Sequence, residues 1–178
     1  MSNRIPSLPI VFAIGLLGLI AAPRSFAITG DWTTVAAACV PDEESAGRYA
    51  AEFGAFQFRG ANTGTVDARC NVTNPRDDTN NPGWGVMEVT YNDPDGAAAP
   101  AQVVVYLRRV HKVTGASSDI VVFNSNAFAA GQQLRSVGFH HAFNFTDYAY
   151  YIAFSVRRTV SSLAPKIQRV RLYIAPVG

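Results

Sequence analysis

Residues 148–156 read YAYYIAFSV, and this stretch decides the fold. Large apolar or aromatic side chains occupy every second position from Tyr148 to Val156, and Ala149, Tyr151, Ala153 and Ser155 stand between them. Successive side chains of a strand point to opposite faces, so this alternation predicts a β-strand with one buried face. A helix would instead repeat its apolar residues every three or four positions.

The same period of two recurs along most of the chain. Loops rich in Gly, Pro, Asn and Asp separate the alternating stretches, as at 59–64, 74–83 and 92–96. Further strands are expected at 56–58, 66–72, 85–91, 102–113, 119–124, 135–145 and 166–175. About eight antiparallel strands in one domain of this size predict an all-β, jelly-roll-like sandwich.

Two local structures are also expected. The two-residue link Thr146-Asp147 predicts that 135–145 and 148–160 form an antiparallel hairpin, with His141 on its aromatic, buried face and His140 exposed. Pro41 followed by three acidic residues predicts a short helix that reaches Ala51.

The first 27 residues have the order of a secretory signal peptide. A short positive start is followed by the uncharged run 10–22 and by Ser25-Phe26-Ala27, which has small residues at both ends. The uncharged run has 13 residues, whereas a membrane-spanning helix needs about 20. We therefore expect cleavage after Ala27, a single mature domain over 28–178 without a transmembrane helix, and a secreted or periplasmic location.

Removal of this segment changes the charge. The whole chain has a formal net charge of +2, and the only charged residues in the first 27 are Arg4 and Arg24. The mature chain is therefore electroneutral. A nucleic-acid-binding domain is typically basic, so nucleic acid is not expected as a partner.

The two cysteines, Cys39 and Cys70, are expected to form one disulfide in an oxidising compartment. A redox or zinc site is disfavoured, because the chain has no C-x-x-C motif and no histidine at ligand spacing from either cysteine.

Oxygen-bearing loops make calcium the favoured metal candidate, ahead of a histidine site for zinc or copper, since calcium takes six to eight oxygen ligands. The candidate ligands are Asp77, Asp78, Asp93 and Asp95. Ordinary turn chemistry explains the same residues, so no cofactor is the first expectation and calcium the alternative. His140 and His141 are adjacent on an expected strand and point to opposite faces, so they do not share a metal.

Exposed aromatic and cationic side chains are the candidate ligand-binding groups. Sugars stack on aromatic rings, and arginines on strands can bind an anionic polysaccharide or a phosphate, although solvated faces and charged edge strands explain the same arginines. The candidates are Trp84, Tyr151, Tyr173 and Arg157. No G-x-S-x-G, H-E-x-x-H or S-x-x-K motif occurs, so no catalytic residue is assigned and the chain is not expected to be an enzyme.

Three functions fit these observations. The first is an exported, non-catalytic binding module for a carbohydrate or another cell-surface ligand. The second is a structural subunit of an extracellular assembly that self-associates through sheet faces or edges. The third is a small outer-membrane β-barrel, which alternating strands and a length of about 150 residues would suit.

Overall fold

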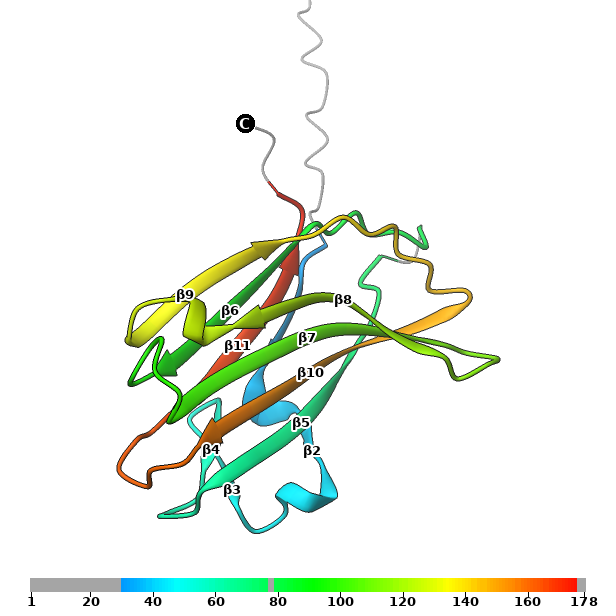
Figure 1. The fold of residues 1–178 in the computed structure, drawn as a ribbon. Coiled ribbons are helices and arrows are strands. Elements are labelled where there is room, and N and C mark those ends of the chain that lie inside the picture. The colour runs from blue at the N-terminus through cyan, green and yellow to red at the C-terminus, as the bar shows by residue number, and fades with distance from the viewer. Residues whose placement is uncertain (1–29, 77–78, 176–178) are drawn as a thin grey trace, which may run out of the picture.

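The computed structural model describes residues 30–76 and 79–175. Its strands form two antiparallel sheets that lie face to face, so the expected all-β sandwich is confirmed (Figure 1). The expected signal peptide at 1–27 lies outside the described residues. Within those residues, no helix has the length and apolar character needed to cross a membrane.

The two sheets contain eleven strands in the described residues, against about eight expected. Sheet A runs β3 (Tyr49–Glu52), β4 (Ala55–Phe58), β11 (Lys166–Tyr173), β6 (Val86–Asp93), β9 (Gly131–Gly138), and β1 (Trp32–Val35) also pairs with β11. Sheet B runs β2 (Val40–Pro41), β5 (Gly64–Val72), β10 (Tyr148–Arg158), β7 (Ala101–His111), β8 (Ser117–Asn124). Three short 3-10 helices are η1 (Ala36–Ala38), η2 (Glu43–Ser45) and η3 (Ser125–Ala127).

Strand β10 is the centre of sheet B. It pairs antiparallel with β5 on one side and with β7 on the other, over most of its length. Tyr150, Ile152, Phe154 and Val156 are all buried and face sheet A, as the alternation predicts. The inward residues of β5 and β7 are buried beside them, including Val66, Ala68, Val103 and Val105. The sandwich core therefore lies under β10.

The disulfide between Cys39 and Cys70 is confirmed. Cys39 follows η1, where the chain crosses from β1 in sheet A to β2 in sheet B, and Cys70 lies on β5. The bond thus fastens this crossing to β5, the strand between β2 and β10 in sheet B.

The expected C-terminal hairpin is wrong. Strand β9 ends at Gly138 and pairs with β6 in sheet A, whereas β10 belongs to sheet B. The alternating aromatics of 139–145 instead fill one end of the sandwich, where the Phe143 ring packs edge-on against Trp84, 5.1 Å away. Asn144 accepts hydrogen bonds from the backbone N–H groups of Thr146 and Asp147 and so closes a turn. Residues 139–145 therefore have the sequence pattern of a strand but close one end of the sandwich, and this segment is called the plug below.

The expected helix from Asp42 to Ala51 is also wrong beyond a single turn. The 3-10 helix η2 ends at Ser45, Gly47 has a positive φ of 80°, and β3 begins at Tyr49. Among the described strands, both sheets end in edge strands that pair on one side only, namely β1, β3 and β9 in sheet A and β2 and β8 in sheet B. The single closed sheet of the third function considered above is therefore not formed, and that alternative is wrong.

Candidate functional site

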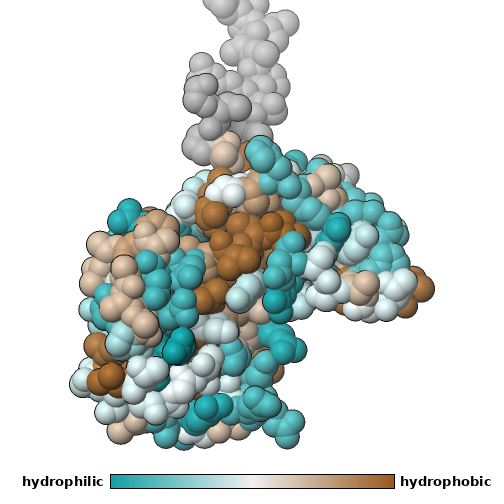
Figure 2. Space-filling view, in the orientation of Figure 1, coloured by the Kyte–Doolittle hydropathy of each residue, from teal (hydrophilic) through white to brown (hydrophobic). Residues whose placement is uncertain are grey.

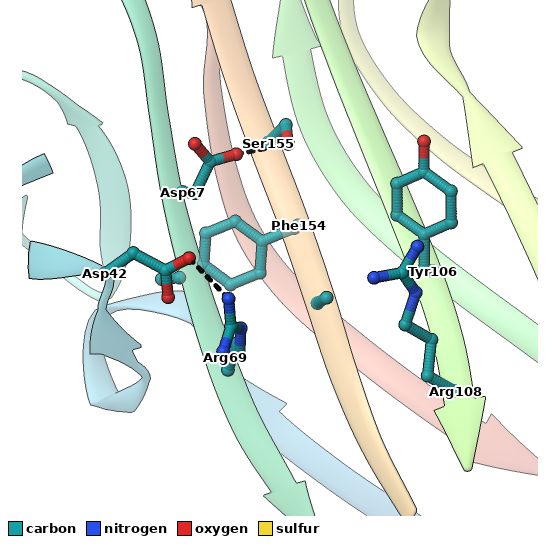
Figure 3. Close-up of a pocket in the computed structure, with 9 residues that line it drawn as sticks. Asp42, Asp67, Arg69, Tyr106, Arg108, Phe154 and Ser155 are labelled. Atoms are coloured by element: carbon teal, nitrogen blue, oxygen red, sulfur yellow. Dashed lines mark hydrogen bonds and ion pairs between the residues drawn. The ribbon is translucent and has the colours of Figure 1, made fainter. Parts of the chain in front are cut away.

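A hollow lies on the outer face of sheet B, above the middle of β10. Its floor is formed where the outward residues of β10 are small, at Ala153 and Ser155. Strand β7 contributes Tyr106 and Arg108 on one side, and β5 contributes Asp67 and Arg69 on the other. The hollow has a volume of about 240 Å³, and Figure 3 shows the two walls on either side of β10.

The wall on β7 is an arginine stacked on a tyrosine. The Arg108 guanidinium carbon lies 4.6 Å from the centre of the Tyr106 ring, and Arg108 Nε donates to Asp119 Oδ1 at 2.6 Å. Burial by itself would lower the pKa of Arg108, but the hydrogen bond and charge of Asp119 raise it above its ordinary value. The guanidinium is therefore charged and already holds one carboxylate.

The opposite wall joins β5 to the segment after β2. Arg69 donates to Asp42 Oδ2 at 2.7 Å, and Asp67 accepts a hydrogen bond from the Ser155 hydroxyl on β10. The backbone N–H of Asp67 donates at 2.7 Å to the buried Ser45 hydroxyl, which pins η2 against β5. These contacts hold the polar groups of this wall in place.

The structure separates the predicted ligand-binding residues. Tyr151 and Arg157 lie on the outer face of β10, on either side of Ala153 and Ser155, and so flank the hollow. Tyr173 lies on the outer face of β11 in sheet A, on the opposite side of the sandwich. The expectation that Trp84 is exposed is wrong, because it is 2% exposed and its indole N–H donates to the Gly30 carbonyl at 2.8 Å.

The wall residues were not predicted as a set. Alternation alone places Asp67 and Arg69 on the outer face of one strand and Tyr106 and Arg108 on that of another. It does not show that β10 inserts between β5 and β7, and only this strand order brings the four residues together.

The calcium candidates are only partly described, because Asp77 and Asp78 lie outside the described residues. Asp93 is fully buried and accepts a hydrogen bond from Ser125, and burial raises the pKa of Asp93 above its ordinary value. Asp95 accepts a hydrogen bond from the backbone N–H of Ala101 at 3.0 Å, and its Oδ1 is buried without a hydrogen-bond partner. The described residues contain no group of three or more His, Cys, Asp or Glu suited to a metal. Both calcium and the absence of a cofactor stay predictions.

His141 lies in the plug at the end of the sandwich. Its Nε2 lies within hydrogen-bond distance of the Tyr150 hydroxyl oxygen, at 3.2 Å, and the same oxygen accepts a hydrogen bond from the backbone N–H of Asn144 at 2.8 Å. It is half-buried and hydrogen-bonded, much as the sequence predicts, and His140 is exposed. Burial, and then the charge of Arg109, lower the pKa of His141 below 6.5.

This shift predicts an acid-sensitive contribution to stability. Below about pH 6.5 the unfolded chain binds a proton at His141 that the folded chain does not, so the free energy of unfolding falls on acidification. We expect His141→Gln to reduce the loss of stability between about pH 7.5 and about pH 5.5, measured by urea unfolding of both proteins. Other groups, including Asp93, contribute equally to both proteins. An unchanged pH dependence in the variant would contradict the prediction.

Comparisons with known proteins leave the family open. No family model matches the chain, and no curated protein matches its sequence. Among solved structures, the chain is similar to the CBM36-1 domain of a multidomain xylanase from the hindgut metagenome of Trinervitermes trinervoides, with 9% identity, a TM-score of 0.47 and coverage of 83% of this chain and 99% of that one. The xylan-binding module CBM15 has 12% identity, a TM-score of 0.47 and coverage of 84% and 99%. A family 11 carbohydrate-binding module from Clostridium thermocellum has 8% identity, a TM-score of 0.40 and coverage of 87% and 94%. Likeness at this level carries no argument about the ligand, which must come from the site itself.

Proposed function

We propose that the chain is an exported, non-catalytic binding module that holds a glycan in the hollow on β10. The observation that carries the proposal is the hollow's composition: a floor of small side chains lies between a tyrosine wall and a wall of fixed hydrogen-bonding groups. The small floor leaves room for a sugar ring, and hydroxyl-rich sugars bind through fixed hydrogen-bonding groups such as those of the walls. Tyr151 and Arg157 extend this surface along β10.

Two further features support parts of the proposal. The disulfide is the bond expected of a protein in an oxidising compartment, in agreement with the export signal predicted from the sequence. Both wall carboxylates already serve as acceptors, Asp42 for Arg69 and Asp67 for Ser155, which suits a binding role. The proposal assigns no reaction to them.

The test is to fill the hollow. Ala153→Trp places a large ring on its floor, and we expect at least a tenfold loss of affinity for any oligosaccharide that the wild type retains on a glycan array. Tyr106→Ala is expected to weaken binding by about threefold to thirtyfold, since it removes one wall. Isothermal titration calorimetry with the selected oligosaccharide gives both values.

Tyr173→Ala is the matched control. Tyr173 is half-buried on an outer face, and the Arg171 guanidinium carbon lies 4.6 Å from the centre of its ring, as Arg108 does over Tyr106. The two variants therefore lose the same kind of contact on opposite sides of the sandwich. The proposal is wrong if Tyr173→Ala weakens binding and Ala153→Trp does not, or if no glycan binds.

A second candidate function is self-association, and a specific surface favours it. The free edge strands β8 and β9 run beside each other, and Figure 2 shows hydrophobic surface in this region. A hollow of about 240 Å³ there is lined by Val122, Phe123, Asn124, Ala127, Phe128 and Val137. Exposed apolar edges are typical of association surfaces. Light scattering after size-exclusion chromatography tests it, and a monomer at every concentration would exclude it.

A further inference from the structure

The charged side chains around the hollow on β10 are mostly acidic. A second hollow of about 370 Å³ adjoins the first, and the two share Asp42, Asp67 and Arg69. Together the hollows are lined by the carboxylates of Asp42, Glu43, Glu44 and Asp67 and by the guanidinium groups of Arg69 and Arg108. Their formal charge is thus −2, although the mature chain as a whole is predicted to be neutral.

Both arginines already hold a carboxylate of the protein. Arg69 pairs with Asp42 at 2.7 Å, and Arg108 pairs with Asp119 at 2.6 Å. A uronic acid or sulfate group could bind either guanidinium only by displacing that carboxylate or by adding a further negative charge beside it. Close like charges in a binding site cost affinity, and this cost discriminates against the wrong ligand.

An uncharged sugar meets no such obstacle. Its hydroxyl groups can donate to Asp42 and Asp67 and can accept from the guanidinium hydrogens of Arg69 that do not bind Asp42. The charge pairs then act as fixed donors and acceptors. We propose that the ligand of this hollow is an uncharged glycan and that the hollow rejects glycans that carry carboxylate or sulfate groups. This inference rests on the proposed function.

Matched ligand pairs test the inference. The wild-type protein is titrated with neutral oligosaccharides and with charged counterparts of the same backbone, such as methyl-esterified and free-acid oligogalacturonides, or xylohexaose with and without glucuronic acid branches. In every pair with measurable binding, we expect the neutral member to bind at least tenfold more tightly. An acidic member that binds equally well or better would overturn the inference but leave the proposed function standing. If no member of any pair and no array glycan binds, the proposed function itself fails.

A charge variant tests the cause of the selectivity. Asp42→Asn removes the carboxylate that pairs with Arg69. We expect this variant to bind the acidic oligosaccharide of each pair at least fivefold more tightly than the wild type does, so that the difference in affinity between the neutral and the acidic oligosaccharide becomes smaller. The control is Asp31→Asn, which removes the partner of Arg171 in an ion pair of 2.5 Å on the outer face of sheet A. This variant is expected to leave the difference in affinity between neutral and acidic oligosaccharides unchanged. Melting curves confirm that both variants fold. The inference would be overturned if Asp42→Asn left the ratio of neutral to acidic affinities unchanged. It would also be overturned if Asp31→Asn lowered that ratio by as much as Asp42→Asn.

Discussion

Replacing Arg158 with methionine is expected to lower the free energy of unfolding by about 2–4 kcal/mol. Arg158 is 4% exposed, and its guanidinium donates to the backbone carbonyls of Asn62 at 2.6 Å, of Leu163 at 2.7 Å and of Gly60. Methionine has a similar length but no donor, so these carbonyls lose their partner. Hydrogen bonds from a charged donor contribute about 1.5–3 kcal/mol each in general, and the total is smaller here because Gly60 and Asn62 lie in an exposed loop where water can replace the guanidinium.

The position of Arg158 explains why a charge is tolerated there. The guanidinium carbon lies 4.6 Å from the centre of the Phe58 ring. None of the ion pairs in the described residues involves Arg158. Burial accordingly lowers the pKa of Arg158 below its ordinary value. The side chain thus joins the loop after β4, almost a hundred residues earlier in the sequence, to the end of β10 and to the turn that follows it before β11.

Arg157 is the matched control for this experiment. It is the preceding residue on β10, but it points to the exposed outer face. Arg157→Met is therefore expected to change the free energy of unfolding by less than about 0.5 kcal/mol. Urea unfolding of both variants measures the difference. Equal losses for the two would show that the carbonyl contacts of Arg158 contribute nothing to stability.

Parts of this fold were predictable because burial in a strand has a local signature. Alternation correctly placed Tyr150, Ile152, Phe154 and Val156 in the core, since each side chain needs only its own strand to define its face. The same rule failed at 139–145, where Phe139 and Phe143 also alternate. There the apolar side chains are buried by packing across the end of the sandwich, which a local pattern does not distinguish from a strand.

The candidate site was less predictable, because it depends on strand order. Asp67 and Tyr106 face one hollow only because residues 148–158, far later in the chain, insert between their strands. Trp84 shows the other difficulty: a loop tryptophan flanked by glycines suggests exposure, but its N–H finds a distant carbonyl at Gly30. A single sequence does not show which residues far apart along the chain will contact each other.

Removing the disulfide is expected to cost the protein about 3–4 kcal/mol of unfolding free energy. Cys39 and Cys70 are separated by 31 residues, and closing a loop of that length restricts the unfolded chain. The bonded segment is also the one that crosses between the sheets, and beyond it Asp42 reaches Arg69 on the wall of the hollow. We therefore expect Cys39→Ala/Cys70→Ala to unfold at a lower urea concentration and to bind the glycan less tightly.

Reduction provides the control for this expectation, because it breaks the same bond without changing any side chain beyond the two sulfurs. Dithiothreitol should destabilise the wild type by about the same 3–4 kcal/mol and leave the double variant unaffected. If the oxidised wild type is no more stable than the double variant, the disulfide does not hold the segment that crosses between the sheets. That segment is then held by packing around Ala36, which is fully buried. If stability falls but glycan affinity does not, the Asp42–Arg69 pair is positioned by the backbone hydrogen bond from Asp42 to the Asp67 carbonyl at 2.9 Å.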